Sequence, residues 1–476
     1  MKATEATVAE SLAHNRACLV RTLYFPENLG IEMRDLRLPT EPPVPALLVW
    51  VDGLVELDAF GAGLAAELDR FTGPAVPPAL PRALTVQRHR WLRDLNVLAD
   101  AVLEGGVALL VEGWSAALVL DDHERIGYPA QKLGVNPHTD IFTWDLRLNL
   151  ALVRKRMRSP RLLAVAAPTR HQHGAAALLY LEGKAYPPLV RAVRRWVRAH
   201  LSEPTFNRRG IAGLPAVFGL LPRFRPTRWP DEVAKFLSEG YVVLLTDRSE
   251  VAYVAPVTQA GWFSLPSDYN LSYPLRRSLA YGRLIAIQLV LLLPGAVVAL
   301  LNYHQEMLPT PFLLALASTR ENAPFGLFFE VLFLELTAEV IRETVFRLPV
   351  SVPMGAGLLT MVLLGLLLVV TGFVGPLPAL ATVMGALLSL VIPEYSGAYL
   401  VRLWRFYFLL SAVLLGFFTM AALFAVLMAY VCQARGWGVP FLGPSGWMFS
   451  SPESGSARPQ VRKGGQAVGK AKAGVR

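Results

Sequence analysis

A largely apolar stretch of the chain carries carboxylates at the spacing of one helix face. Residues 325–348 contain the candidate pore or interface residues Glu330, Glu335, Glu339, Arg342 and Glu343. At about 100° per residue, Glu335, Glu339 and Glu343 fall within an arc of about 80°, and Arg342 lies inside or beside it. Like charges four residues apart on a helix repel mildly, so Arg342, water, a cation or another subunit must offset them.

Two interpretations of this helix remain open. It lies flat on a membrane surface as an amphipathic helix, or it lines a polar pathway, because ionisable residues at membrane depth are costly and usually functional. Residues 399–406 form a second amphipathic segment, in which two arginines three residues apart adjoin apolar side chains. Either this segment forms a belt of aromatic and basic residues at head-group level, or it takes part in gating and subunit contact. The candidate interfacial or gating residues are Arg402, Trp404 and Arg405.

Catalytic signatures are scarce. The sequence contains no phosphate-binding loop, dinucleotide fingerprint, kinase motif set or HExxH motif. His171 and His173 flank Gln172 with no carboxylate or cysteine close in sequence, and the acidic run 121–124 resembles the end of a hairpin. We therefore expect no enzyme, with no catalytic residues, no cofactor and no metal site.

Charge divides the 476 residues into two parts. Residues 276–440 hold nine arginines and seven glutamates, with neither lysine nor aspartate. The rest of the chain is about twice as dense in charge, which predicts a water-soluble half followed by a membrane half. The net charge of +10 owes much to six basic residues in 441–476. Beside a membrane span, such a tail indicates an orientation signal or an anionic-lipid contact rather than nucleic-acid binding.

The membrane half, 276–440, is predicted to contain about four spans and the amphipathic helix. The candidate spans are apolar stretches at 279–301, 351–373, 379–392 and 406–432. Arginines flank the start of the first, and the basic, flexible tail 441–476 follows the last, so both ends favour the cytoplasm. The N-terminus has no apolar signal-peptide core, which predicts that the soluble half also stays cytoplasmic.

The soluble half contains a weak internal duplication. Residues 45–56 and 176–186 both read as buried strands that end in an acidic residue plus glycine, and Asp52 and Glu182 are assigned to turns. Residues 104–121 and 239–256 both read as hairpins, with Gly106 matched to Gly240. The fold class expected is α+β/α: two tandem small α/β cytoplasmic subdomains, residues 1–140 and 141–275, then an all-α polytopic membrane domain.

Several strings, in order along the chain, resemble the A-type subunits of bacterial spore germination receptors, the GerA family, which includes relatives of the stage V sporulation AF type. Residues 307–325, MLPTPFLLALASTRENAPF, resemble the family's MIPTPLLISIAASREGVPFP. Residues 330–349, EVLFLELTAEVIRETVFRLP, are similar to EALLMELAFELLREAGLRLP. Residues 392–406 and 438–442 resemble the family's IPSY…LRLLRF and GVPYLSP.

This resemblance implies a multi-pass subunit of the cell or spore inner membrane. The family's A subunit works with a transporter-like B-type subunit and a C-type lipoprotein, and it associates with copies of itself. It forms or regulates an oligomeric ion channel that responds to nutrient germinants. From the basic tail we also expect contact with membrane lipids and no nucleic-acid partner. The alternative to a channel is a non-conducting, membrane-anchored scaffold that assembles germination proteins through its soluble domains. That alternative arises because residues 354–370 are almost wholly apolar where the family carries polar residues.

Overall fold

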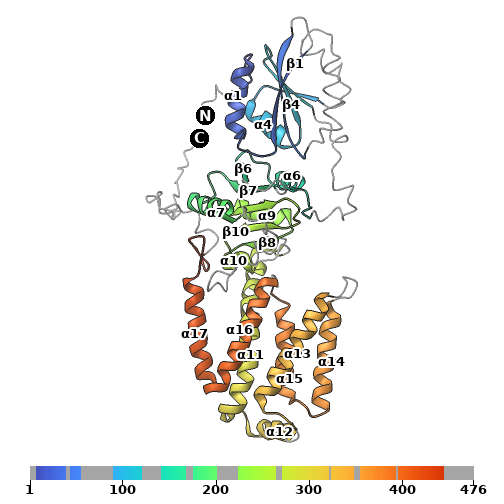
Figure 1. Ribbon diagram of the computed structural model, residues 1–476, viewed down its shortest axis with the longest axis vertical. Helices are drawn as coiled ribbons and strands as arrows, with labels where there is room; N and C mark the ends of the chain where they lie inside the picture. Colours follow the sequence, from blue (N-terminus) through green and yellow to red (C-terminus); the bar gives the residue numbers. More distant parts are fainter. Residues whose placement is uncertain are drawn as a thin grey trace, which may run out of the picture.

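Two small α/β units are stacked end to end on a bundle of long helices (Figure 1). This computed structural model describes residues 7–38, 43–54, 89–120, 141–167, 175–200, 223–263, 268, 271–320, 323–347, 354–392 and 395–443. The predicted boundary at residue 140, the residues at 121–124 and 171–173, and the tail beyond Gly443 lie outside the described residues.

The first unit is an antiparallel sheet whose described strands follow the order β1-β2-β4-β5-β3. Its central strands are buried on both faces. Their sequences are therefore continuous apolar runs and do not alternate between apolar and polar residues. Two helices cover one face of the sheet. The elements are α1 (Leu12–Leu23), β1 (Ile31–Leu38), β2 (Val44–Val51), β3 (His89–Leu92), α4 (Leu95–Leu103), β4 (Val107–Val111) and β5 (Ala117–Leu120).

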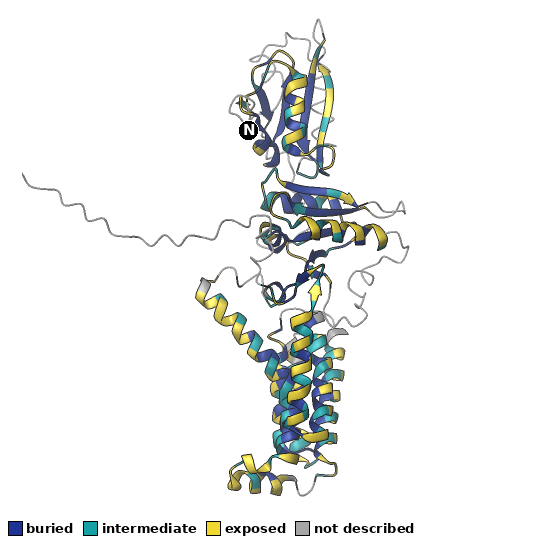
Figure 2. Ribbon diagram, turned by 90° about the vertical axis from the view of Figure 1, so that its left-hand side faces the viewer, coloured by how far each residue is buried: buried dark blue, intermediate teal, exposed yellow. Residues whose placement is uncertain are grey.

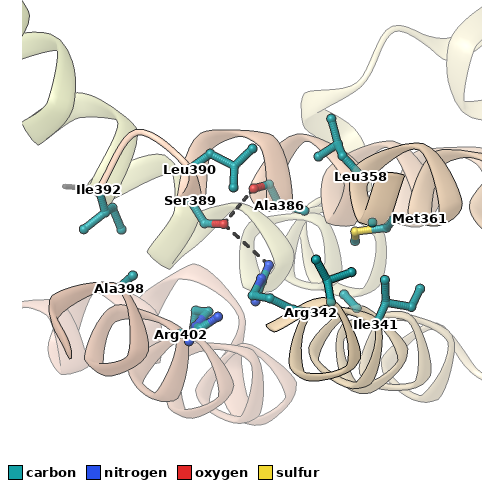
Figure 3. Close-up of a pocket in the computed structure, with 13 residues that line it drawn as sticks. Ile341, Arg342, Leu358, Met361, Ala386, Ser389, Leu390, Ile392, Ala398 and Arg402 are labelled. Atoms are coloured by element: carbon teal, nitrogen blue, oxygen red, sulfur yellow. Dashed lines mark hydrogen bonds between the residues drawn. The ribbon is translucent and has the colours of Figure 1, made fainter. Parts of the chain in front are cut away.

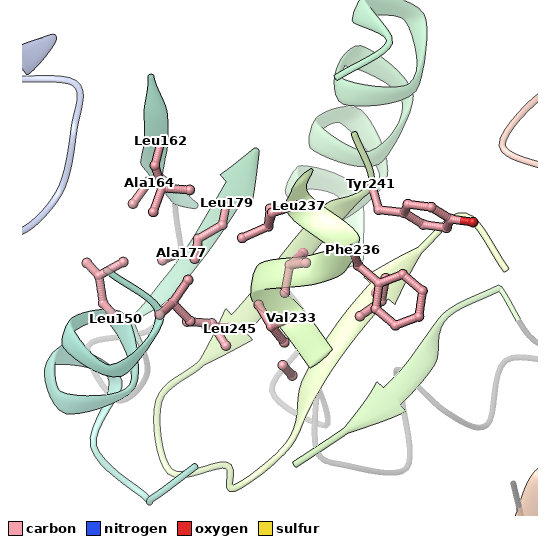
Figure 4. Packing of buried hydrophobic residues seen from close by; sticks show 14 of the residues in the cluster. Leu150, Leu162, Ala164, Ala177, Leu179, Val233, Phe236, Leu237, Tyr241 and Leu245 are labelled. Carbon is pink, nitrogen blue, oxygen red and sulfur yellow. The ribbon is translucent and has the colours of Figure 1, made fainter. Parts of the chain in front are cut away.

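The second unit repeats this design, with strand order β6-β7-β9-β10-β8. Helices α6 and α9 pack on one face, where Leu150, Val233 and Phe236 meet apolar strand residues (Figure 4), and α7 covers the other face. The elements are α6 (Leu146–Arg156), β6 (Leu162–Ala167), β7 (Ala176–Leu181), α7 (Pro187–His200), β8 (Arg225–Thr227), α9 (Pro230–Ser238), β9 (Val242–Thr246), β10 (Ala252–Ala255) and α10 (Gln259–Trp262).

Matched hydrogen bonds confirm the internal duplication. Asn15 exchanges two hydrogen bonds with the backbone of Ala9, and Asn149 does the same with Thr143, six residues upstream in each case. Both predicted hairpins form, as β4–β5 and β9–β10.

One detail of the predicted repeat alignment was wrong. Gly105, not Gly106, corresponds to Gly240. The amide of Gly105 donates to Val102 as that of Gly240 donates to Leu237, and the residue after each glycine donates five residues back. The doubled glycine at 105–106 hid this one-residue offset, because sequence alone does not say which of the two closes the helix.

The C-terminal half is helical. Helices α11 and α13 to α17 run along the long axis, and α12 lies across the end farthest from the sheets (Figure 1). A short hairpin, β11–β12, returns the chain to the second unit. The elements are α11 (Tyr273–Tyr303), a 3-10 turn (Gln305–Met307), α12 (Thr310–Arg320), α13 (Leu327–Arg347), α14 (Met354–Val370), α15 (Pro376–Ser389), α16 (Tyr395–Leu415), α17 (Phe417–Gln433), β11 (Arg435–Gly436) and β12 (Val439–Pro440).

The prediction of one long helix over 406–432 was wrong. Gly416 has φ 65° and ψ −134°, which ends α16 and starts α17. A side chain is strained in that conformation, and the hydroxyl of Tyr303 donates to the carbonyl oxygens of Val413 and Leu414 at the end of α16. The amphipathic segment 399–406 is consequently the first half of α16 and not a separate element.

Replacing Gly416 with alanine is expected to lower the free energy of unfolding by about 1–3 kcal/mol, the usual cost of a strained backbone conformation. An added Cβ would also lie 3.1 Å from Cβ of Tyr303. Gly365→Ala in α14 is the matched control, since its Cβ would lie 3.6 Å from Val383, an ordinary contact. Thermal unfolding of the purified protein in detergent measures both, and equal melting temperatures would show that the break tolerates a side chain.

Aromatic side chains join the helical bundle to the second unit. The indole of Trp437, in the β11–β12 turn, donates to the carbonyl oxygen of Arg223 at 3.0 Å and packs against Trp196. Phe441 is buried against Trp262 of α10, although it begins the segment predicted to be a flexible tail. Trp262 also approaches Gly397 of α16 so closely that a Cβ there would lie 2.9 Å from the ring.

Two of the described helices contain segments long and apolar enough to cross a membrane, Pro274–Tyr303 and Gly397–Leu415. Shorter apolar segments occur at Thr310–Thr319, Gly357–Val370, Pro376–Ser389 and Phe417–Gln433. Large apolar side chains are exposed along the outside of the bundle, for example Ile285, Leu363 and Phe418 (Figure 2).

Candidate functional site

The charged residues predicted on two separate segments meet inside the helical bundle. Helix α13 turns Leu334, Glu335 and Ala338 inward, while Phe333 and Leu336 are exposed. Helix α16 brings Arg402 and Arg405 to the same place, and both are buried. Glutamates four apart on α13 therefore face arginines three apart on α16, which is one helical turn on each side.

Glu335 and Arg405 form an ion pair in the core of the bundle. Each side chain is 1% exposed. Thr382 of α15, also buried, lies against the carboxylate. Gly385 of α15 leaves room for the guanidinium, since a Cβ there would lie 3.4 Å from Nη1 of Arg405. Removing either charge would leave the other buried without a counter-charge, which is the costly case for a pair of this kind.

Glu339 forms the second half of the cluster. Its carboxylate accepts a hydrogen bond from Nη1 of Arg342 at 2.6 Å and lies 3.5 Å from Nη1 of Arg402. Nη2 of Arg342 in turn lies 3.5 Å from the hydroxyl of Ser389 in α15 (Figure 3). The cluster thus ties α13, α15 and α16 together through side chains, at the end of the bundle nearer the soluble units.

Three of the predicted site residues lie elsewhere. Glu330 is buried, and its carboxylate accepts a hydrogen bond at 2.9 Å from the amide of Gly375, at the start of α15. A carboxylate at that position satisfies a helix N-terminus and its dipole. Glu343 is exposed. Trp404 packs against Tyr407 and Phe408.

Arg342 and Arg402 also line a cavity of about 240 Å³ between α13, α14, α15 and α16 (Figure 3). Apart from these two arginines and Ser389, the lining consists of apolar residues and glycine. The combination of an apolar wall and a cationic edge distinguishes this cavity from an ordinary packing void.

A different buried arginine holds the two soluble units together. Arg154 of α6 is 2% exposed and donates to Oδ1 of Asn28 at 2.8 Å and to the carbonyl oxygen of Leu29. Burial lowers the pKa of Arg154 to about 10, and the charge of Asp52 opposes that shift. The basic end of α6 is therefore not a free cationic surface. Arg156 pairs with Asp231, and Arg158 pairs with Glu104 at 3.2 Å.

Within the described residues, no three histidine, cysteine, aspartate or glutamate side chains are grouped so that they could hold a metal ion. Cys18 and Cys432 are both free thiols.

Comparison with known proteins assigns the chain to a family. Residues 23–454 match the family described as Bacillus/Clostridium GerA spore germination protein. The chain belongs to the GerA family. The predicted resemblance is thereby confirmed, over nearly the whole sequence.

Named relatives agree with this assignment. The GerA-family chain is 27% identical to spore germination protein A1 of Bacillus subtilis strain 168 over 358 residues, 73% of this chain and 74% of that protein. It is 23% identical to spore germination protein KA of the same organism over 427 residues, 87% of this chain and 78% of that protein. A solved structure, the N-terminal domain of the A subunit of the Bacillus megaterium spore germinant receptor GerK3, aligns with TM-score 0.41 and 18% identity, over 53% of this chain and 96% of that domain.

Sequence reasoning found both charged segments of this GerA-family chain but did not pair them. The contributions of Thr382 and Ser389 in α15 were also missed. The available signal was the complementary order: Glu335 precedes Glu339 as Arg402 precedes Arg405, so antiparallel helices place Glu335 opposite Arg405 and Glu339 opposite Arg402.

Proposed function

We propose that this GerA-family chain is a membrane subunit of a spore germination receptor complex that forms or regulates an oligomeric ion channel opened by nutrient germinants. The observation that carries the proposal is the charged cluster of Glu335, Glu339, Arg342, Arg402 and Arg405 within an otherwise apolar bundle. Ionisable groups at membrane depth are costly and are usually kept for transport or sensing. Family membership supports the germination context.

In this proposal, α11 and α13 to α17 form the membrane-embedded bundle in the cell or spore inner membrane. Helix α13 then counts as a crossing and not as a surface helix, because it packs along α14 and α15. Helix α15, with 14 residues, rises about 21 Å and is largely enclosed by its neighbours. The start of α11 and the end of α17 lie on the side of the soluble units (Figure 1), which we place in the cytoplasm with the basic tail.

The paired state of the cluster corresponds to a closed channel. Glu335 is neutralised by Arg405 and shielded from water, so it cannot attract a cation. Separating α13 from α16 would free two carboxylates on one helix face, and a ring of such faces from several copies would favour cations. The proposed partners are copies of this chain and the B-type and C-type subunits of the receptor. Aromatic contacts at Trp262 and Trp437 give a route by which the soluble units act on α16 and α17.

Neutralising Glu335 and Glu339 together by glutamine is expected to reduce cation flux through the reconstituted protein by about tenfold or more, because carboxylates lining a path raise the local cation concentration by roughly that factor. Ion release from germinating spores carrying the variant is the second measurement. Glu343→Gln is the matched control, since that residue is exposed on the same helix.

Glu335 is buried, so native mass and thermal unfolding of each variant must accompany the flux. Glu339→Gln alone, at a side chain 32% exposed, provides a milder variant. If flux, ion release and assembly all remain normal in the double variant, the cluster is not on the ion pathway.

The alternative function is a non-conducting scaffold. It is favoured by α14, whose exposed positions are predominantly apolar and offer a pathway little polar lining. A scaffold predicts that the wild-type protein assembles with other receptor subunits but carries no ion flux when reconstituted with them. Flux that depends on Glu335 and Glu339 would exclude it.

A further inference from the structure

The cavity between α13, α14, α15 and α16 has the chemistry of a site for an amphiphile. Its walls include Ile341, Leu358, Met361 and Ile392, which are apolar. A hydrated ion or a small polar solute would lose water in contact with such a surface and gain little in return. The walls therefore suit a hydrocarbon chain.

The cationic groups of the cavity lie together at one side. Figure 3 shows Arg342 and Arg402 side by side, with the Ser389 hydroxyl near Arg342. A guanidinium binds phosphate through two parallel hydrogen bonds, which lysine cannot do. Because Glu339 already contacts both arginines, an incoming phosphate would share or replace that carboxylate.

We propose that this cavity binds one anionic phospholipid, with its phosphate on Arg342 and Arg402 and the first part of an acyl chain along Met361 and Ile341. The inference rests on the membrane placement in the proposed function, which puts this end of the bundle at the cytoplasmic head-group level. Basic pockets between membrane helices on that side characteristically bind anionic head groups. The lipid thereby contacts two residues of the charged cluster, so occupancy of the cavity and pairing of Glu339 are coupled.

The small lining residues explain why the cavity stays open. Ala338, Ala386 and Ala398 place only a methyl group at its surface. Gly357 allows α14 to approach α13, because a Cβ there would lie 2.4 Å from Cγ2 of Val345. The helices are thus in close contact at Gly357 while leaving room at the alanines.

The test is native mass spectrometry of the full chain, purified in detergent and equilibrated with equimolar phosphatidylglycerol and phosphatidylcholine of identical acyl chains. We expect one phosphatidylglycerol to be retained, preferred by roughly a factor of five for each arginine. Met361→Trp, which fills the cavity, is expected to abolish that retention. Leu363→Trp is the matched control, because Leu363 lies two residues away on α14 and is 55% exposed.

Two further measurements test whether the arginine charge sets the lipid preference and whether the site binds a lipid or a free anion. Arg342→Gln is expected to retain lipid but to reduce the preference for phosphatidylglycerol about fivefold. Added inorganic phosphate at millimolar concentration distinguishes a lipid site from a free-anion site. Complete displacement of phosphatidylglycerol by phosphate would overturn the assignment to lipid.

Equal loss of lipid in Met361→Trp and Leu363→Trp, or equal retention of the two lipids by the wild type, would overturn the proposal. Lipid retention is measured without ion flux, so the two proposals fail separately. Flux without lipid preference removes only the lipid site, whereas lipid preference without flux leaves the site and removes the channel.

Discussion

Replacing Arg405 with methionine is expected to lower the free energy of unfolding by about 3–5 kcal/mol. The arginine is 1% exposed, and the same is true of its partner Glu335. Methionine fills most of the volume but leaves the carboxylate buried in an apolar bundle without its counter-charge. The loss thus measures the cost of an uncompensated charge and not the net value of the pair. Thermal or denaturant unfolding of the purified protein, followed by circular dichroism, is the measurement.

The double variant Glu335→Met with Arg405→Met decides whether this explanation is correct. Replacing both members of a buried pair by apolar residues of similar volume is often neutral or stabilising, so the double variant is expected to recover most of the stability lost by Arg405→Met. If the stability losses of Glu335→Met and Arg405→Met simply add up in the double variant, the two side chains are not coupled, and the pairing is contradicted. Arg277→Met is a control for the loss of an exposed arginine in the same half, where the expected change is within about 0.5 kcal/mol.

The same double variant separates stability from function. It restores a folded bundle but removes the carboxylate at position 335. If the cluster lies on the ion pathway, the double variant folds and assembles yet conducts poorly. If the pair serves only to hold α13 against α16, conduction recovers together with stability.

Local patterns in the sequence predicted the parts of the fold that depend on neighbouring residues. The apolar runs of β2 and β7 and the paired hairpins appear as predicted because strand burial and turn residues leave a short-range signal. Helix α13 also begins and ends close to its predicted limits. In each case, hydrophobic periodicity and turn-forming residues suffice.

The structural features that the sequence did not predict depend on contacts between residues far apart in the chain. The break at Gly416 depends on Tyr303, which lies 113 residues earlier and satisfies the end of α16. The pairing of Glu335 with Arg405 depends on which helices become neighbours, and composition does not encode that choice. The burial of Arg154, a cation in the last turn of α6, likewise follows from docking of the first unit on the second.

Asn28 is the residue on which this docking depends most, and Asn28→Ala is expected to lower the free energy of unfolding by about 2–4 kcal/mol. Its amide donates to the carbonyl oxygens of Leu23 and Leu162, at 3.2 and 3.0 Å. Its Oδ1 accepts from Arg154 at 2.8 Å and from the amide of Ala164 at 3.0 Å. Both donors and both lone pairs of the side chain are therefore used in a site that is 2% exposed.

Alanine at position 28 would leave four buried partners short of a hydrogen bond, one in the first unit (Leu23) and three in the second (Arg154, Leu162 and Ala164). The loss should appear as earlier unfolding of the soluble half and as faster amide exchange at Leu29 and Ala164, whose backbones are joined by a 2.7 Å hydrogen bond. Glu27→Ala, at the exposed neighbouring position, is the control and should leave exchange unchanged. Normal exchange at the junction in Asn28→Ala would mean that the units are held by their other contacts, and that movement between them does not pass through Asn28 and Arg154.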